Sequence, residues 1–450
     1  MKKKISYIIL TVILIIGAIY FYRYKMPIKI ANTFPKGTKA IVSINLRQLE
    51  HHFLADVLSN PSLYLATKKK SPKKDTVKVK KKKQSSFFKE ISIPKNIQFF
   101  TKDEGLAQTW ISSKLQISNN KTLATLISSK GFEKIKTKTE LTVYEKKGIY
   151  FIIDSTGLRI AYSNKKAIPN FATILNSTEL IAETSLLFTK LKNNNSDICY
   201  LANDKDHIDI NFTDGKIDLK GFLNFDILNE QTITVDTTAI TSLAVNINKK
   251  SNVYKEFYGN IKKDKFKRLM FSDIDSISEK WTGKFRFELL DFATDIDSIV
   301  TYEYDDNFNK TEKITVQKTN NPNFNLELNT NKNLWNYLES KNTIDLSENK
   351  PVFKPFPLLK TFIESSDDKI RLFTKTSNKK SEATTLNKLS FHTNFTKYRN
   401  YSKNTMYYFF DDLLMLDKFD ITISKNNELS ATILMNNEHR NALTQLVKFK

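Results

Sequence analysis

Histidine and cysteine, the side chains most often used for metal binding and nucleophilic chemistry, are scarce here: five histidines and one cysteine in 450 residues. His52 and Asp56 stand four positions apart in a segment with helical periodicity, so one helix face could offer both to a metal ion. No second His or Cys pair is evident to complete the ligand set. The sequence therefore favours a structural interpretation, in which His51 and His52 flank an apolar stripe containing Phe53.

His207 and Asp209 share one face of a predicted strand, because side chains two positions apart point the same way. We expect the two side chains to lie on a solvated face of a sheet and not in a binding site. His439 stands between Glu438 and Arg440 and is expected on the surface of a terminal helix.

The stretch DDNFNKTE places Asp305, Asn307 and Asn309 at alternate positions, as a calcium-binding loop does. However, Lys310 occupies the position of the usual glycine, and Val316 that of the closing glutamate. We therefore expect a polar hairpin turn here.

The spacing of glycine excludes the common nucleotide-binding motifs. No two of the ten glycines are closer than six positions, so neither GxGxxG nor GxxxxGK can occur. The motifs GxSxG, HExxH and CxxC are also missing. The sequence nominates no catalytic residue, no cofactor-binding residue and no metal ligand. A hydrolase built from isolated carboxylates remains the alternative, because acid–base sites need only two or three groups at no fixed spacing.

The N-terminal stretch MKKKISYIILTVILIIGAIYFYRYK predicts a transmembrane anchor. Residues 5–22 are uncharged and, as a helix, would span about 27 Å, the thickness of a hydrocarbon core. The small residues that a signal-peptide cleavage site requires are not at the right spacing, so the anchor is expected to be uncleaved. The residues that define it are Ile5, Tyr7, Ile8, Leu10, Val12, Leu14, Ile16, Ile19, Tyr20 and Tyr22.

The anchor also predicts a location. Residues 1–4 form a short tail that is most simply left in the cytoplasm, with the bulk of the chain exported to the periplasmic side of the inner membrane. Lys and Arg are nearly balanced on the two flanks, so this orientation is a hypothesis.

The stretch KKKSPKKDTVKVKKKK, residues 68–83, is the second unusual segment. We expect a disordered insertion, since it lacks apolar periodicity. A solvated loop, contact with anionic lipid or wall polymer, and a nucleic-acid arm all stay open, although only eight of the 71 basic residues are arginine, which argues against nucleic acid. Its lysines are Lys68, Lys69, Lys70, Lys73, Lys74, Lys78, Lys80, Lys81, Lys82 and Lys83. Much of the net charge of +23 lies here and in the first 36 residues.

The remaining chain alternates strand-like and helix-like segments, which predicts an α+β fold. The order of elements beginning at 39–58 and ending in a hairpin at 207–225 is repeated from 241–258 to a hairpin at 419–437. We therefore expect a transmembrane helix, a juxtamembrane linker at 23–36, and two divergent tandem β-rich modules with antiparallel sheets and packed helices. The modules are expected at 37–235 and 236–450.

Aromatic residues are abundant, with 32 Phe and 18 Tyr, and most are expected in the core. The exception is KPVFKPFP, residues 350–357, whose three prolines cannot sit in a central strand. We expect an exposed or polyproline-like segment there, and it is the best interaction candidate.

The anchor, the stretch P-x-G-T-x-A-I-V-S-I-N-L at 35–46, the β-meander and the terminal hairpin before NALTQLVKF together resemble a group of uncharacterised, membrane-anchored bacterial envelope proteins. The resemblance implies fold and location but brings no catalytic motif and no cofactor. It favours a noncatalytic role in binding or scaffolding, with the membrane and envelope proteins, lipid or wall polymer as partners. The envelope hydrolase is the alternative.

Overall fold

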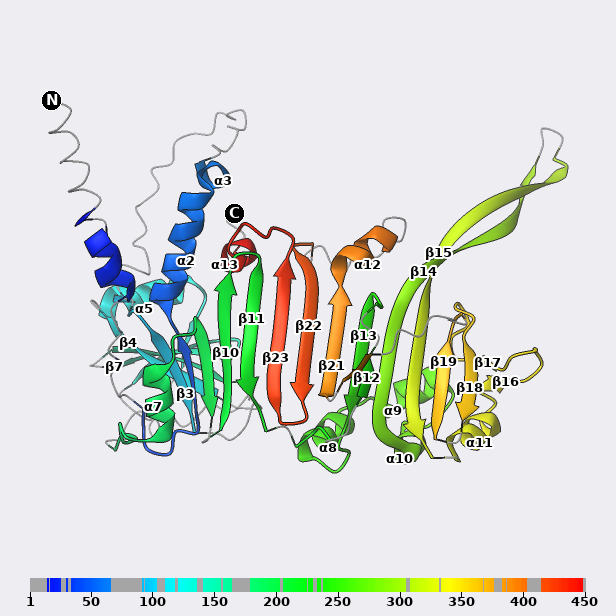
Figure 1. Ribbon diagram of the computed structural model, residues 1–450, viewed down its shortest axis with the longest axis horizontal. Helices are drawn as coiled ribbons and strands as arrows, with labels where there is room; N and C mark the ends of the chain where they lie inside the picture. The colour runs from blue at the N-terminus through cyan, green and yellow to red at the C-terminus, as the bar shows by residue number, and fades with distance from the viewer. Residues whose placement is uncertain are drawn as a thin grey trace. The chain divides into compact units, whose positions relative to one another are not determined.

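The structure is a computed structural model whose elements are shown in Figure 1. It describes residues 14–15, 17–25, 30, 34–65, 91–92, 94–102, 110–117, 120–135, 141–154, 157–163, 179–202, 205–224, 226–229, 233–235, 238–304, 308–331, 333–366, 368–375, 383–385, 387–402 and 414–447. The chain divides into two compact units, Met1–Asp214 with His439–Lys450, and Gly215–Glu438.

Unit 1 is built on antiparallel strands in the order β10-β9-β1-β3-β4-β8-β7-β6-β5. A two-residue strand, β2, also pairs with β4. The strands are β1 Ala40–Ile44, β2 Ile91–Ser92, β3 Ile97–Thr101, β4 Trp110–Ile117, β5 Glu133–Ile135, β6 Thr142–Lys146, β7 Ile149–Asp154, β8 Gly157–Ser163, β9 Ile198–Ala202 and β10 Asp206–Thr213. The helices are η1 Phe21–Lys25, α2 Leu46–Ser59, α3 Pro61–Leu65, α5 Asn120–Ser129, α7 Leu186–Asn193 and α13 Ala442–Leu446.

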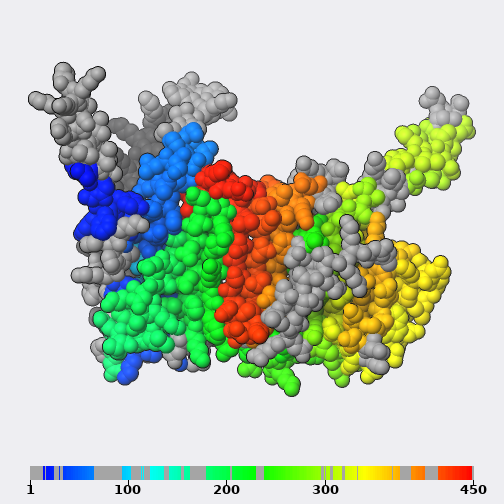
Figure 2. Space-filling model, viewed as in Figure 1, coloured from blue at the N-terminus to red at the C-terminus, as the bar shows by residue number. Residues whose placement is uncertain are grey.

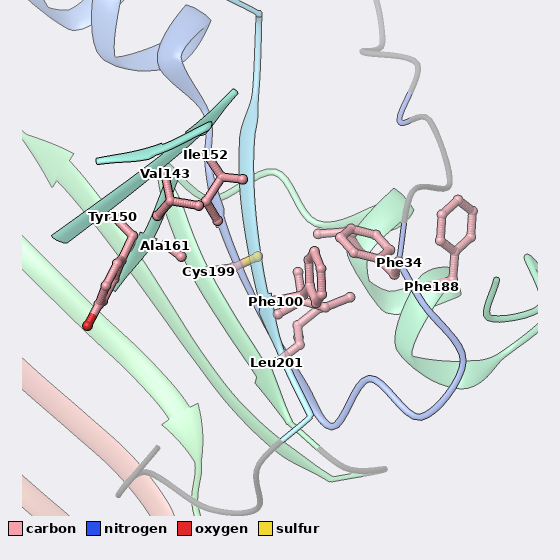
Figure 3. Packing of buried hydrophobic residues seen from close by; sticks show 11 residues of the cluster. Phe34, Phe100, Val143, Tyr150, Ile152, Ala161, Phe188, Cys199 and Leu201 are labelled. Atoms are coloured by element: carbon pink, nitrogen blue, oxygen red, sulfur yellow. The ribbon is translucent and has the colours of Figure 1, made fainter. Parts of the chain in front are cut away.

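The main core of unit 1 joins strands that are far apart in the sequence. Phe100 of β3, Ile152 of β7 and Leu201 of β9 are all buried in one cluster, which also takes in Phe188 of α7 (Figure 3). Because these side chains come from both ends of the sheet order, the strands must curve around a shared interior. Apolar burial of this kind is the main favourable term in folding.

Unit 2 has a longer antiparallel order, β11-β23-β22-β21-β13-β14-β15-β19-β18-β17-β16. A separate pair is formed by β12 and β20. The strands are β11 Lys216–Phe222, β12 Ile233–Val235, β13 Thr241–Asn246, β14 Trp281–Tyr304, β15 Lys310–Thr330, β16 Ile344–Asp345, β17 Val352–Phe353, β18 Phe362–Ser366, β19 Lys369–Phe373, β20 Ala383–Thr385, β21 Asn387–Asn394, β22 Leu416–Ser424 and β23 Glu428–Met435. The helices are α8 Asn252–Gly259, α9 Lys263–Met270, α10 Ile274–Lys280, α11 Asn333–Ser340 and α12 Phe395–Ser402.

The strand orders within the two units coincide. If β1 is set against β13, then β3-β4 corresponds to β14-β15, the run β5 to β8 to the run β16 to β19, and β9-β10 to β21-β22. A single helix, α5 or α11, follows the second strand of the corresponding pair in each unit. A duplicated module requires such agreement. We call the strands from β1 onward the first series and those from β13 onward the second series. β11 directly follows β10 in the chain and so belongs to the first series, but it pairs with β23 of the second series.

The predicted α+β fold class is wrong, because the protein is predominantly β with large antiparallel sheet structure. Two strands alone, β14 and β15, take 24 and 21 residues, whereas α2, the longest helix among the described residues, has 14. Side chains that alternate in polarity fit a pleated surface, and this alternation extends much further along the chain than the helical pattern does.

The predicted transmembrane anchor is also wrong, and with it the single-pass, signal-anchor and inner-membrane assignment. Within the described part of the chain, no helix is both long enough and apolar enough to span a bilayer. The end of the expected span is bound to α2 by polar contacts: Tyr20 Oη lies 2.8 Å from His51 Nε2, and Arg23 pairs with Glu50. Of the anchor residues, Leu14, Ile19, Tyr20 and Tyr22 are described, and the others lie outside the described residues.

The face of α2 that is buried differs from the expected one. The sequence predicts an apolar stripe containing Phe53, yet Phe53 is only half-buried and the two buried residues are Arg47 and Asp56. The reason is tertiary, because α13 approaches α2 on the Asp56 side.

Asp56 is a buried carboxylate that fastens the C-terminal segment to α2. It accepts hydrogen bonds from the Asn441 N–H at 3.1 Å, from Thr444 Oγ1 at 2.8 Å and from Tyr64 Oη, and Arg440 lies beside it. Burial of the carboxyl raises its pKa, but these donors outweigh burial and hold the pKa below its usual range. The charged form is therefore favoured in the folded protein.

We expect Asp56→Asn to lower the free energy of unfolding by about 3 kcal/mol at pH 7, because it leaves several buried donors poorly matched. The folded-state pKa is depressed, so the contribution is present above the unfolded pKa of about 4 and is lost as the pH falls through the folded value. Urea denaturation at pH 7 and at pH 3 measures both effects. Glu179→Gln, which breaks the exposed pair with Lys36, is the control and should cost less than about 1 kcal/mol. Equal costs for the two variants would contradict this role of Asp56.

Gly283 allows β14 to pass close to the end of β13. Its φ is +110°, and a Cβ added there would lie 2.3 Å from the carbonyl oxygen of Ile247. The strand pairing also shifts register between Trp281 and Phe285, which marks a bulge. Only glycine fits this backbone without displacing the neighbouring chain.

We expect Gly283→Ala to destabilise the protein by more than about 2 kcal/mol in urea denaturation, through the clash and the backbone strain. Gly259→Ala is the matched control, since no atom lies within 4 Å of a Cβ there, and its effect should stay within about 1 kcal/mol. A Gly283→Ala protein as stable as the control would show that this close approach is not required.

Candidate functional site

His52 and Asp56, four positions apart on α2, have different partners. His52 Nε2 lies 2.9 Å from Asp197 Oδ1, and Asp197 is 2% exposed and also accepts the backbone N–H of Phe212 at 2.7 Å. Asp56 is held by the C-terminal segment. Within the described residues, no group of three His, Cys, Asp or Glu side chains is placed to hold a metal ion. The His52–Asp197 pair joins α2 to the strands of unit 1.

His207 and Asp209 both line a cavity of about 300 Å³ beside α7. Asp209 Oδ1 accepts hydrogen bonds from Asn194 Nδ2 and from Ser196 Oγ at 3.0 Å, so the carboxylate is already engaged. His207 Nδ1 lies 3.1 Å from the carbonyl oxygen of Lys205. The cavity therefore offers hydrogen-bonding groups, but its single carboxylate is committed to local structure.

Cys199 is 2% exposed in the core of unit 1 (Figure 3). Burial, reinforced by the negative charge of Asp209, raises the pKa of its thiol to about 12. A nucleophilic cysteine needs the opposite, a lowered pKa and access to solvent. Cys199 therefore contributes to the packing of the hydrophobic core.

The distal half of the β14–β15 hairpin is exposed at every side chain that the structure describes, and we call it the arm: residues 298–304 of β14 and 310–316 of β15. β14 pairs with β13 only from Lys284 to Leu289, and β15 pairs with β19 only from Asn325 to Asn329. Beyond those points the described residues of the arm pair only with one another. The arm extends past the neighbouring strands of its unit (Figures 1 and 2).

A break in strand pairing marks the place where β14 leaves the sheet. Its register shifts between Leu289 and Asp291, directly after the last residue that pairs with β13. Bulges bend a strand and increase its twist, which turns the arm away from the sheet. In the part of unit 1 that the structure describes, the corresponding strands β3 and β4 have five and eight residues and show no such extension.

One face of the arm carries a row of apolar side chains, together with Glu312 opposite Tyr302 and Lys310 opposite Tyr304. Val300 lies opposite Ile314, and Tyr302 follows two residues later on the same face, with Tyr304 beyond it. These four side chains are between 46% and 67% exposed, and Val316 extends the same row at 59%. Lys310 Nζ lies 3.7 Å from the centre of the Tyr302 ring. We call this row the arm ladder.

The other face of the arm is polar. Thr301 Oγ1 donates to the carbonyl oxygen of Lys313 at 3.0 Å, and Lys313 forms an ion pair with Glu303 at 2.5 Å. The arm is therefore two-sided, with polar contacts satisfied within the hairpin on one face and exposed apolar side chains on the other. Two-stranded hairpins are marginally stable alone, and a covered apolar face or a third strand is the usual remedy.

The sequence motifs considered above do not identify the arm. The polar hairpin turn expected in this stretch includes Asp305 and Asn307, which lie outside the described residues, while Tyr304 and Lys310 on either side of it pair with each other. The whole lysine tract 68–83 also lies outside the described residues. The available signal for the arm was the alternation of Val300, Tyr302 and Tyr304, which sequence reasoning missed because acidic and amide residues surround it.

The proline-rich segment 350–357 is only partly as expected. Val352–Phe353 forms the short strand β17, and Phe353 is buried, with the Phe356 ring 5.5 Å from it. The side chains of Phe353 and Phe356 therefore pack into the interior of unit 2. Lys350 and Pro357, at the two ends of the segment, are exposed, and Leu358, just after it, is 97% exposed.

The state of Cys199 gives a direct prediction. A thiol-reactive dye at pH 8 should label the folded protein at least about 100-fold more slowly than the urea-unfolded protein, because the thiol is buried and its pKa is raised. The labelling rate is read from dye absorbance with and without urea. Rapid labelling of the folded protein would show that Cys199 is accessible.

No family model matches the chain, and no curated protein matches it. Among solved structures, crystal form III of TP0453 aligns with 8% sequence identity and a TM-score of 0.22, covering 76% of this chain and 92% of that one. A likeness this distant carries no argument about fold or function. The resemblance to uncharacterised envelope proteins therefore stays a prediction.

Proposed function

We propose that the protein is a noncatalytic binding protein that holds a protein partner against the arm ladder. The observation that carries this proposal is the row of exposed apolar side chains on the arm, whose two strand edges pair with no other described strand. Exposed apolar rows and unpaired strand edges are both surfaces that associate readily. The arm contributes little to the sheet of its own unit, so its length is best explained by a partner.

The arm fits a protein better than the other partner classes that the sequence raised, which were lipid and wall polymer. The unpaired edges of β14 and β15 offer backbone N–H and C=O groups, which another extended backbone satisfies in register. A lipid tail can cover the ladder but cannot pair with those groups. A partner segment that adds a strand pairs with these backbone groups, and its apolar side chains cover Val300 and Ile314.

The hydrolase alternative receives no support from the described cavities. One is lined by a single carboxylate, Asp209, and another by a single carboxylate, Glu364. Glycoside hydrolysis by carboxylates typically uses a pair flanking one bond. Binding rather than catalysis therefore accounts for the arrangement.

The test places a photo-crosslinking amino acid at Tyr302 in the full chain, in the cells that produce it, and identifies crosslinked proteins by mass spectrometry. We expect a reproducible protein partner whose yield falls at least fivefold when Val300→Ser and Ile314→Ser are combined, because the ladder loses its apolar contact. Thr301→Ser with Thr311→Ser, on the polar face of the same hairpin, is the matched control and should leave the yield unchanged.

Two results would defeat the proposal. One is a set of crosslinked proteins that responds equally to the ladder variant and to the polar-face control. The other is crosslinking to lipid alone. Urea denaturation of both variants confirms that the body of unit 2 is intact, since the arm lies beyond its paired strands.

A further inference from the structure

A groove of about 570 Å³ lies in unit 2 between helix α11 and the edge of strand β18. Its lining residues are Trp335 and Asn336 from α11, Pro351 before β17, and Ile363, Glu364, Ser365 and Ser366 from β18. The volume is typical of sites that bind small ligands or short peptide segments. The groove is separate in sequence and in strand order from the arm.

Among the described residues, the pairing of β17 with β18 ends at Pro351 on the side of β18 that faces the groove. β17 and β18 pair at Val352 and Phe362, and the Ile363 N–H donates to the carbonyl oxygen of Pro351 at 2.9 Å. Pro351 has no N–H to continue the ladder. No described residue of β17 pairs with β18 beyond this point, while β18 continues to pair with β19 as far as Ser366.

The alternation of a strand decides which backbone groups face the groove. Because the Ile363 N–H points toward β17 and away from β19, the N–H and C=O of Ser365, two residues on, point to the same side. Ser365 is exposed. Its backbone therefore offers one donor and one acceptor along the groove, with α11 forming the opposite wall.

The side chains of the groove add a charge preference. Glu364 is the only charged residue among those that line it, and its side chain is 51% exposed. Arg371 Nη1 is 3.8 Å away, but its Nε donates to Asn325 at 2.6 Å and its guanidinium lies over the Phe373 ring. Arg371 is thus held by other partners. Trp335 supplies aromatic surface, which attracts cations as well as apolar groups.

We propose that this groove binds a short extended peptide segment carrying a basic side chain, which adds as a strand to the free edge of β18. The Ser365 backbone pairs with the peptide backbone, Glu364 pairs with the basic side chain, and Trp335 contacts the neighbouring part of the segment. A groove between an edge strand and a helix is suited to strand addition, in which main-chain hydrogen bonds supply affinity and side chains supply specificity.

The test uses a fluorescein-labelled peptide, Gly-Val-Lys-Val-Lys-Val-Gly, and the full chain, with binding followed by fluorescence anisotropy. We expect saturable binding that weakens at least tenfold when the peptide backbone amides are N-methylated, a change that needs no protein variant. Replacing both lysines of the peptide by glutamate should weaken binding at least fivefold, and Glu364→Gln should remove most of that preference.

Ser365→Pro with Ser365→Ala is the matched pair of protein variants. Both remove the hydroxyl, but only proline removes the N–H that faces the groove, so Ser365→Pro should lose at least tenfold in affinity and Ser365→Ala should lose less than twofold. Equal losses for the two variants, no binding of the lysine peptide at 1 mM, or binding of chitotriose in its place would each overturn the proposal. Because the arm is not touched, these results are independent of the partner proposed for the arm.

Discussion

Antiparallel pairing around the first strand of each series is the constraint on which the fold depends. β1 pairs with β3 on one side and with β9 on the other, and β13 likewise pairs with β14 and β21. The early strand is thus central, and the sheet of each unit is complete only when a strand more than a hundred residues later has returned beside it. Loop closure over such distances costs entropy that only the finished sheet and its core offset.

This constraint explains where the buried polar side chains lie. Asp56 and the His52–Asp197 pair both connect α2, which directly follows β1, to segments that arrive much later in the chain. In unit 2 the close approach of Gly283 to Ile247 lets β14 turn back beside β13 directly after α10. Buried hydrogen-bonded groups of this kind are costly to leave unmatched, so they define one arrangement of the late segments.

The two candidate binding surfaces arise where pairing stops. β14 stops pairing with β13 at Leu289, and the arm lies further along the same hairpin; the groove lies where the described pairing of β17 with β18 ends, at Pro351 and Ile363. Both leave backbone groups on a strand edge, and both place aromatic side chains beside that edge. Edge strands are usually kept short or covered, because an uncovered strand edge pairs readily with another chain.

Several local elements could be predicted from the sequence alone, because neighbouring residues determine them. The hairpin of β22 and β23 and the meander of β6, β7 and β8 follow from alternation and turn residues. The transmembrane anchor, the buried face of α2 and the fold class were predicted wrongly. Each depends on which distant segment covers a surface, as with Tyr20 on His51 or α13 on Asp56, and no local pattern records that. The sequence by itself determined which segments alternate in polarity and which catalytic motifs are missing. Only the tertiary structure decided which strand edges stay unpaired, because pairing joins residues that are far apart in the chain.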